Sequence, residues 1–145
     1  MEDRYLYKAK TTPKEKGEFN NVWVTGNLIV SNGKYYIHPV GNVVNVKNEI
    51  GRIIVMHEVI PDTICQCTDL KDKNGKLIWE NDICDRKEEY PEIVKYNNGD
   101  WTLDYSYSKG KESGYCYCNL GFYALERKCV EVIGNIFDNP ELLEV

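Results

Sequence analysis

Short apolar segments separated by turn-forming residues run through most of the chain, a pattern typical of β-strands rather than helices. The segments "VWVTGNLIV" (22–30) and "KYYIHPV" (34–40) are rich in β-branched and aromatic residues, and Asn32-Gly33 between them predicts a β-hairpin. Strand-like sequence continues to Pro61, which ends it because proline cannot donate to a strand ladder. We therefore predict an N-terminal β-segment over residues 1–61.

The remaining residues, 62–145, repeat this pattern in segments such as "TICQC", "EIVKY", "DWTLDYSYS", "YCYCNLGFYAL" and "CVEVIGNIF". Such a series predicts antiparallel strands that form a small SH3-like barrel or sandwich in this C-terminal part. The one helix signal is "DNPELLEV", where Asn139 can cap and Pro140 can open a short C-terminal helix. The predicted fold class is mainly β, either all-β or β-dominated α+β.

The stretch "DLKDKNGKLIWENDIC" (69–84) contains two turn signals. Asn74-Gly75 can form a tight turn, with Asp72 leading into it. At a second corner, Asn81 tolerates the left-handed backbone region and Asp82 can accept a hydrogen bond from the nearby backbone. We interpret all five residues as structural turn residues, with a surface recognition loop as the rival interpretation.

The longer string "IPDTICQCTDLKDKNGKLIWENDIC" (60–84) resembles the YopX-like family of bacteriophage and prophage proteins. The resemblance extends to "VWVTGNLIVSNGKYYI" upstream and to "EVIGNIFDNPELL" near the end. Cys67 stands where the family usually has an aromatic residue, and Asp69 and Asn81 stand where it has glycines. If those glycines have positive φ, Asp and Asn are the expected replacements. The resemblance implies a phage-encoded, β-rich protein inside the bacterial host cell, and it transfers no activity and no functional residue.

The charge of the 145-residue chain is unevenly distributed. Residues 1–61 carry 8 Lys+Arg against 6 Asp+Glu, whereas residues 62–145 carry 10 against 17. Nucleic acid is therefore not an expected partner of the acidic second part, because phosphate binding depends on positive charge. We expect no secretory signal and no membrane span, because the chain opens on charged residues and no apolar run approaches the roughly 18 residues that a span requires. We expect a cytoplasmic protein with reduced cysteines and no membrane partner.

Six cysteines form the most suggestive chemical pattern: Cys65, Cys67, Cys84, Cys116, Cys118 and Cys129. Two C-x-C pairs could offer four thiolates to zinc. On a straight strand, however, residues i and i+2 lie about 6.6 Å apart, whereas thiolates on one zinc lie roughly 3.8 Å apart. Buried, reduced cysteine is the favoured interpretation, zinc remains an open alternative, and no metal or cofactor is predicted.

Catalytic residues are hard to find. His38 and His57 are the only histidines, and nothing in their spacing pairs either with a cysteine nucleophile. The acidic run "ENDICDRKEEYPE" (80–92) is interspersed with Arg86 and Lys87, which indicates a solvated loop rather than paired catalytic acids. We predict that the protein is not an enzyme, with a reactive Cys–His pair as an alternative.

Aromatic residues concentrate late in the chain. The predicted interaction surface consists of Trp101, Tyr105, Tyr107, Tyr115 and Tyr117, because Tyr and Trp are enriched at protein interfaces. The predicted function is that of a non-enzymatic accessory protein that binds an unknown protein partner or forms a homo-oligomer. The alternative is a single-stranded nucleic-acid-binding β-barrel protein that combines exposed aromatics with the lysines of "KAKTTPKEK" (8–16).

Overall fold

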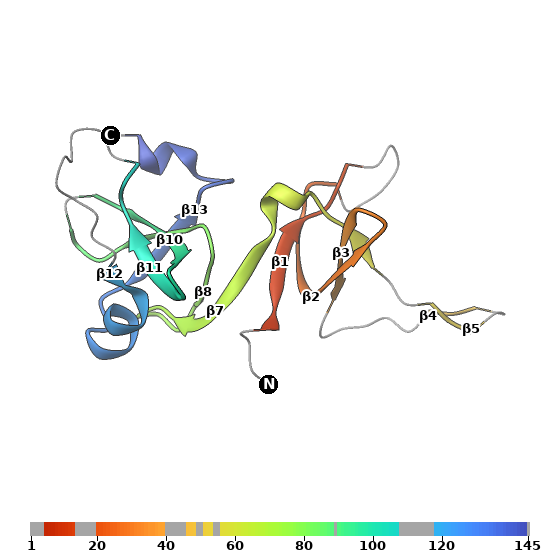
Figure 1. The fold of residues 1–145 in the computed structure, drawn as a ribbon, viewed down its shortest axis with the longest axis horizontal. Helices are drawn as coiled ribbons and strands as arrows, with labels where there is room; N and C mark the ends of the chain where they lie inside the picture. Colours follow the sequence, from red (N-terminus) through yellow and green to blue (C-terminus); the bar gives the residue numbers. More distant parts are fainter. Residues whose placement is uncertain are drawn as a thin grey trace. The chain divides into compact units, whose positions relative to one another are not determined.

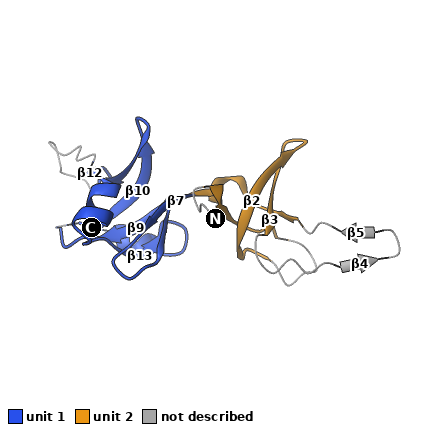
Figure 2. Ribbon diagram, turned by 90° about the horizontal axis from the view of Figure 1, so that it is seen from below, with its two compact units in different colours: residues 1–3, 67–145 blue, residues 4–66 orange. Residues whose placement is uncertain are grey.

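The structure is a computed structural model that describes residues 5–13, 20–39, 46–48, 51–53, 56–88, 90–107 and 118–144 (Figure 1). It divides into two compact units: an N-terminal unit of residues 4–66, and a C-terminal unit of residues 67–145 together with residues 1–3 (Figure 2). The sequence analysis places the join after Pro61, and the division in the structure follows Gln66. Among the described residues, no helix has the length and apolar character that a membrane span requires.

The N-terminal unit is an antiparallel sheet in which β1 lies beside β2, β2 beside β3 and β3 beside β6. The bounds of these strands are β1 (Tyr7–Lys10), β2 (Trp23–Ser31), β3 (Lys34–Pro39) and β6 (His57–Glu58). The first residues of β7 (Cys65–Lys71) pair with β1, after a single 3-10 turn, η2 (Pro61–Thr63). A separate two-stranded ladder joins β4 (Val46–Asn48) to β5 (Gly51–Ile53).

The predicted hairpin is present as β2 and β3. Its turn residues Asn32 and Gly33 have φ values of 51° and 72°, the left-handed region that this residue pair favours. Gly26 lies opposite Pro39 on the neighbouring strand. A Cβ at position 26 would lie only 1.9 Å from the carbonyl oxygen of His38, so the two strands can approach this closely only because residue 26 is glycine.

The C-terminal unit contains a five-stranded antiparallel sheet in the order β12-β11-β10-β9-β13. The bounds of its strands are β9 (Asp82–Asp85), β10 (Glu92–Asn97), β11 (Asp100–Asp104), β12 (Cys118–Asn119) and β13 (Glu131–Asn135). Within this unit, β7 also pairs with β8 (Leu77–Trp79). The sequence analysis predicts a small barrel, but closure would require a β12–β13 ladder, and the described residues form an open sheet with these two strands at its edges. The coarser prediction of a β-dominated antiparallel fold is confirmed.

Helical structure differs from the sequence prediction at two places. The segment "YCYCNLGFYAL", interpreted as a strand, becomes helical at Leu120 and continues as a π-helical turn, η3 (Phe122–Glu126). The Asn119 side chain accepts a hydrogen bond from the Phe122 backbone N–H at 2.7 Å, which favours this turn. Leu120 and Ala124, four residues apart, both lie in the core, so helical spacing buries two apolar side chains together.

The short C-terminal helix is reduced to one 3-10 turn, η4 (Pro140–Leu143). Asn139 occupies the N-cap position, but its side chain makes no capping hydrogen bond. Its amide oxygen instead accepts from the backbone N–H of Asn135 at 3.2 Å. The predicted cap residue therefore stabilises the preceding turn, and no α-helix forms after it.

Each unit has its own buried core. In the N-terminal unit the core is built on Ala9, Ile37 and Val59. In the C-terminal unit eight buried residues form one cluster: Ile78, Cys84, Val94, Leu103, Cys118, Leu120, Ala124 and Val130. Alternation along the strands places Val94 and Leu103 on the same face of the five-stranded sheet as the helical turn that contains Leu120.

Candidate functional site

Asp72 organises the first predicted turn. Its Oδ1 atom accepts hydrogen bonds from the backbone N–H groups of Asn74 and Lys76, each at 2.9 Å, and its Oδ2 atom accepts one from Val132 at 3.0 Å. Burial by itself raises the pKa of this carboxyl. The three backbone hydrogen bonds lower the pKa by more than burial raises it, so the pKa of Asp72 lies below its usual value. Gly75 completes the turn with a φ of 80°. The carboxylate thus connects the turn to β13, 60 residues later in the chain.

The second corner is also held by its own polar side chains. Asn81 has a φ of 69°. Asp69, which also stands where the resembled family has a glycine, has a φ of 63°. Both are the positive values that a replaced glycine implies. The Oδ2 atom of Asp82 accepts a hydrogen bond from the Trp79 backbone N–H at 2.8 Å. These residues therefore hold the backbone at both corners of the stretch 69–84.

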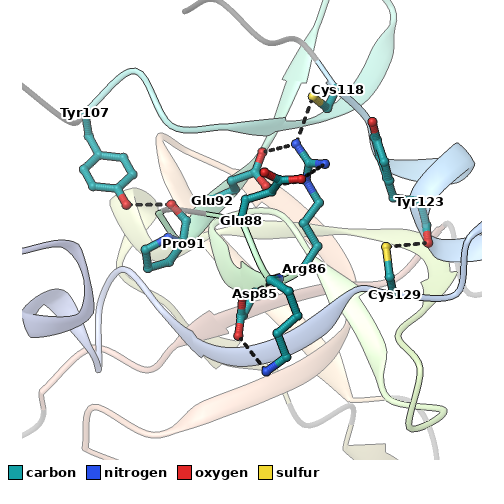
Figure 3. A network of polar contacts seen from close by, with 10 residues as sticks. Asp85, Arg86, Glu88, Pro91, Glu92, Tyr107, Cys118, Tyr123 and Cys129 are labelled. Atoms are coloured by element: carbon teal, nitrogen blue, oxygen red, sulfur yellow. Dashed lines mark hydrogen bonds and ion pairs between the residues drawn. The ribbon is translucent and has the colours of Figure 1, made fainter. Parts of the chain in front are cut away.

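A buried ion pair is the feature that the sequence analysis missed (Figure 3). The Nε atom of Arg86 lies 2.5 Å from Oε1 of Glu92, and Nη2 lies 3.4 Å from Oε2 of the same carboxylate. The side chain of Glu92 is 1% exposed and that of Arg86 is 9% exposed. The interpretation of residues 80–92 as a solvated loop is wrong at these two positions, because the strands β9 and β10 bring the two charges together inside the unit.

The surroundings of Arg86 explain why it remains charged. Its guanidinium carbon lies 4.2 Å from the centre of the Tyr123 ring, a cation–π contact, and Nη2 donates to the Sγ atom of Cys118 at 3.2 Å. Burial lowers the pKa of Arg86, but the hydrogen bond and charge of Glu92 raise it above its usual range. Both oxygens of the Glu92 carboxylate accept hydrogen bonds from Arg86. The pair fits a structural role better than general acid catalysis.

The five cysteines that the structure describes divide into two states, and Cys116 lies outside the described residues. Cys65, Cys67 and Cys84 are buried free thiols, and Cys129 is a half-buried free thiol. Cys118 is disulfide-bonded, so the expectation of reduced cysteine fails at this position. Burial raises the pKa of the Cys84 thiol, and the nearby carboxylates of Asp82 and Glu92 raise it further, which makes it a poor nucleophile. Within the described ranges, no three His, Cys, Asp or Glu side chains are arranged to hold a metal ion.

The two histidines lie on adjacent strands of the N-terminal unit. His57 of β6 lies opposite Ile37 in the ladder, whereas His38 is the residue that follows Ile37 on β3. Because neighbouring residues on a strand point to opposite faces, the two imidazoles project from different faces of the sheet. The structure therefore does not bring His38 and His57 together in one site.

The predicted aromatic residues have different environments. Trp101 is half-buried against the C-terminal core, and its ring meets that of Tyr96 edge-on, with centroids 5.1 Å apart. The hydroxyl of Tyr107 donates to the carbonyl oxygen of Pro91 at 2.6 Å (Figure 3), and burial together with the charge of Glu92 raises the pKa of this phenol. Tyr105 is half-buried. The calls on Tyr115 and Tyr117 lie outside the described residues.

The exposed apolar side chains are different residues, which the sequence analysis did not single out. Tyr96 is 57% exposed, Phe122 43% and Leu125 61%. Tyr96 shares a sheet face with Val94, and Trp101 shares it with Leu103, so both lie on the face that the helical turn covers. The Asn119 side-chain amide also donates to the Asp100 carboxylate, which connects the start of that turn to β11. We call Tyr96, Trp101, Phe122 and Leu125 the aromatic surface.

A comparison with protein families gives one result that covers nearly the whole chain. The family model described as YopX protein matches residues 3–144. A search of curated proteins finds no match.

Proposed function

Because the chain belongs to the YopX family, and this membership alone gives no activity, we propose a function from the surface of the C-terminal unit. The protein is a non-enzymatic accessory protein of a phage or prophage, acting in the cytoplasm of its host. It binds another protein through the aromatic surface, and an oligomer built through the same contact is one form of this function.

The observation that supports this proposal is the exposure of large apolar side chains beside a completed core. The side chains of Tyr96, Phe122 and Leu125 are exposed to solvent. The buried core of this unit, which includes Val94 and Leu103, is complete without them. Burying one such side chain stabilises a complex by roughly 1.5–3 kcal/mol. Exposed aromatic side chains such as the Tyr96 ring, which packs edge-on against Trp101, are typical of interface hot spots.

The net charge of the C-terminal unit indicates the sign of the charge that a partner protein carries. Residues 67–145 carry 10 Lys+Arg against 16 Asp+Glu, a net charge of −6. This net negative charge favours a partner of net positive charge, because complementary charge accelerates encounter and suppresses wrong partners. A partner that fits is therefore a basic protein surface.

The test is a double variant, Tyr96→Ser with Leu125→Ser, because both side chains are exposed and their removal leaves the core intact. The matched control is Val30→Ser, which removes a 58% exposed apolar side chain from the N-terminal unit. Native mass spectrometry should show fewer subunits in the double variant, or quantitative pull-downs should show that it no longer retains a bound protein. The control should behave like wild type in both measurements. Identical assembly states and partners in wild type, double variant and control would overturn the proposal.

A further inference from the structure

Cys118 differs chemically from the other cysteines that the structure describes. It is disulfide-bonded, whereas Cys65, Cys67, Cys84 and Cys129 are free thiols. The binding function proposed above makes no use of this disulfide. A disulfide beside free thiols is either a structural crosslink or a reducible one, and the groups around its sulfur decide between these roles.

The sulfur of Cys118 lies beside a buried cation (Figure 3). The Nη2 atom of Arg86 donates a hydrogen bond to this sulfur at 3.2 Å, and the Arg86 side chain is only 9% exposed. A neutral disulfide sulfur is a weak acceptor, whereas a thiolate in the same place accepts a charge-assisted hydrogen bond. Arg86 therefore stabilises the reduced form of Cys118 more than the oxidised form.

Two contacts hold the guanidinium of Arg86 in this position without the help of the disulfide. Its Nε atom donates to Glu92 at 2.5 Å, and its guanidinium carbon lies 4.2 Å from the centre of the Tyr123 ring. Both contacts can persist after the S–S bond is broken. The Glu92 carboxylate opposes a second anion nearby, but the charged group in hydrogen-bond contact with the sulfur is the cation.

Stabilising a thiolate at Cys118 makes this residue a good leaving group. In thiol–disulfide exchange, the thiolate of a reductant attacks one sulfur, the S–S bond breaks, and the other sulfur departs with the electron pair. When Cys118 departs, its negative charge forms beside Arg86. The second thiol of a dithiol reductant then resolves the mixed disulfide. The reductant is oxidised to a disulfide, and the two sulfurs of the chain are reduced.

The disulfide is connected to the helical turn that follows it. Cys118 belongs to β12, an edge strand of the five-stranded sheet, and lies opposite Leu103 of β11. The turn begins at Leu120, which belongs to the same buried cluster as Cys118. Breaking the S–S bond therefore removes a covalent restraint from the strand that leads into the turn.

We propose that the Cys118 disulfide is a redox switch that a dithiol reductant opens, with Arg86 as the positioning residue that receives the Cys118 thiolate. Reduction loosens β12 and the helical turn. This turn carries Phe122 and Leu125 of the aromatic surface, but the switch does not rest on the binding function. Its test measures only the sulfur and the backbone, so the two proposals can fail independently.

The first measurement is the reduced fraction of Cys118 in the full-length protein, equilibrated with mixtures of reduced and oxidised dithiothreitol and quantified by alkylation and peptide mass spectrometry. Wild type should be half reduced even with oxidised dithiothreitol in about tenfold excess. The variant Arg86→Met with Glu92→Leu removes the cation and should need about tenfold more reduced dithiothreitol for half reduction. The control Cys129→Ser removes a free thiol of the same unit and should match wild type within about twofold.

The second measurement is hydrogen exchange of the backbone amides of residues 118–126 with and without reductant. Reduction should speed exchange there by about tenfold and leave the β2–β3 hairpin unchanged. Cys118→Ser cannot form the disulfide and should exchange at the reduced rate under both conditions.

Three results would overturn the proposal. Wild type might need an excess of reduced dithiothreitol for half reduction, which would identify a structural crosslink. The folded Arg86→Met, Glu92→Leu variant might be reduced as readily as wild type, or exchange of residues 118–126 might not respond to reduction. If circular dichroism shows that the double variant does not fold, the wild-type reduction and the exchange of wild type and Cys118→Ser still decide.

Discussion

Replacing Asp72 by Asn tests whether one buried carboxylate holds the turn and β13 together. The substitution keeps a side-chain oxygen for the N–H groups of Asn74 and Lys76 but puts an amide NH2 where Oδ2 accepts from Val132. An amide NH2 cannot accept that bond, so the Val132 N–H is left unsatisfied in a partly buried place. Leaving a buried donor unsatisfied costs roughly 1–3 kcal/mol, and we expect the free energy of unfolding to fall by about 2 kcal/mol.

The effect should also depend on pH. Because the three N–H groups hold the pKa of Asp72 below its usual value of 3.8, the folded state favours the ionised form. The stability that this linkage contributes is complete above the unfolded-state pKa and is lost as pH falls through the folded-state pKa. The difference in unfolding free energy between wild type and Asp72→Asn should therefore be constant from about pH 5 to 7 and should shrink below about pH 4.

Urea unfolding followed by circular dichroism at a series of pH values measures both effects. The matched control is Asp69→Asn, because Asp69 is exposed and Asn tolerates its positive φ, so we expect a change below about 0.5 kcal/mol. If Asp72→Asn unfolds within about 0.5 kcal/mol of wild type at pH 7, or if its deficit does not depend on pH, the assigned role of this carboxylate is wrong.

Three further predictions concern the interior. Gly26→Ala should destabilise the N-terminal unit by about 2 kcal/mol or more, because its Cβ would clash with the backbone of His38; hydrogen exchange of β2 and β3 amides measures this. Arg86→Met or Glu92→Leu alone should cost about 3–5 kcal/mol in urea unfolding, and the double variant should cost much less than the sum, since each single change leaves a buried charge unpaired. Alkylation in denaturant without reductant should label Cys65, Cys67, Cys84 and Cys129 but not Cys118, and in the folded protein Cys84 should react far more slowly than a free thiol.

Each of these predictions has a clear contrary outcome. Equal amide protection in Gly26→Ala and wild type would mean that the strands can separate without cost. Additive losses in the double variant would mean that the two buried charges do not interact. Labelling of Cys118 without reductant would show that it is a free thiol in solution.

Local turn chemistry was the part of the structure that the sequence revealed best. The hairpin at Asn32-Gly33 and the positive φ values at Asp69 and Asn81 depend on residues within a few positions, and few side chains tolerate those backbone angles. Asp72 was identified as a turn residue for the same reason. The hydrogen bond that Asp72 accepts from Val132 was not predicted, because a local pattern does not show which strand, 60 residues later in the chain, lies beside the turn.

The interior of the C-terminal unit could not be read from local patterns. A run of charged residues is usually solvated, so Arg86 and Glu92 gave no sign that two strands would bury them as a pair. The helical turn at Phe122–Glu126 was also missed, since a short apolar segment with aromatic residues suits strand and helix alike. Trp101, a residue of the predicted interaction surface, is half-buried, and the exposed residue beside it is Tyr96, because exposure depends on what the core already covers.

The pairing of β9 with β13 has a consequence for how the protein is made. When a ribosome has completed β12, four of the five strands of this sheet exist, but one side of β9 still lacks its partner, because Glu131 lies opposite Asp85 only once β13 has been synthesised. Until then, β9 presents unpaired backbone groups and the Asp72 carboxylate lacks the Val132 N–H. One edge of β9 thus stays unpaired for most of the synthesis of this unit, and the exposure of β9 to wrong partners ends only when β13 emerges.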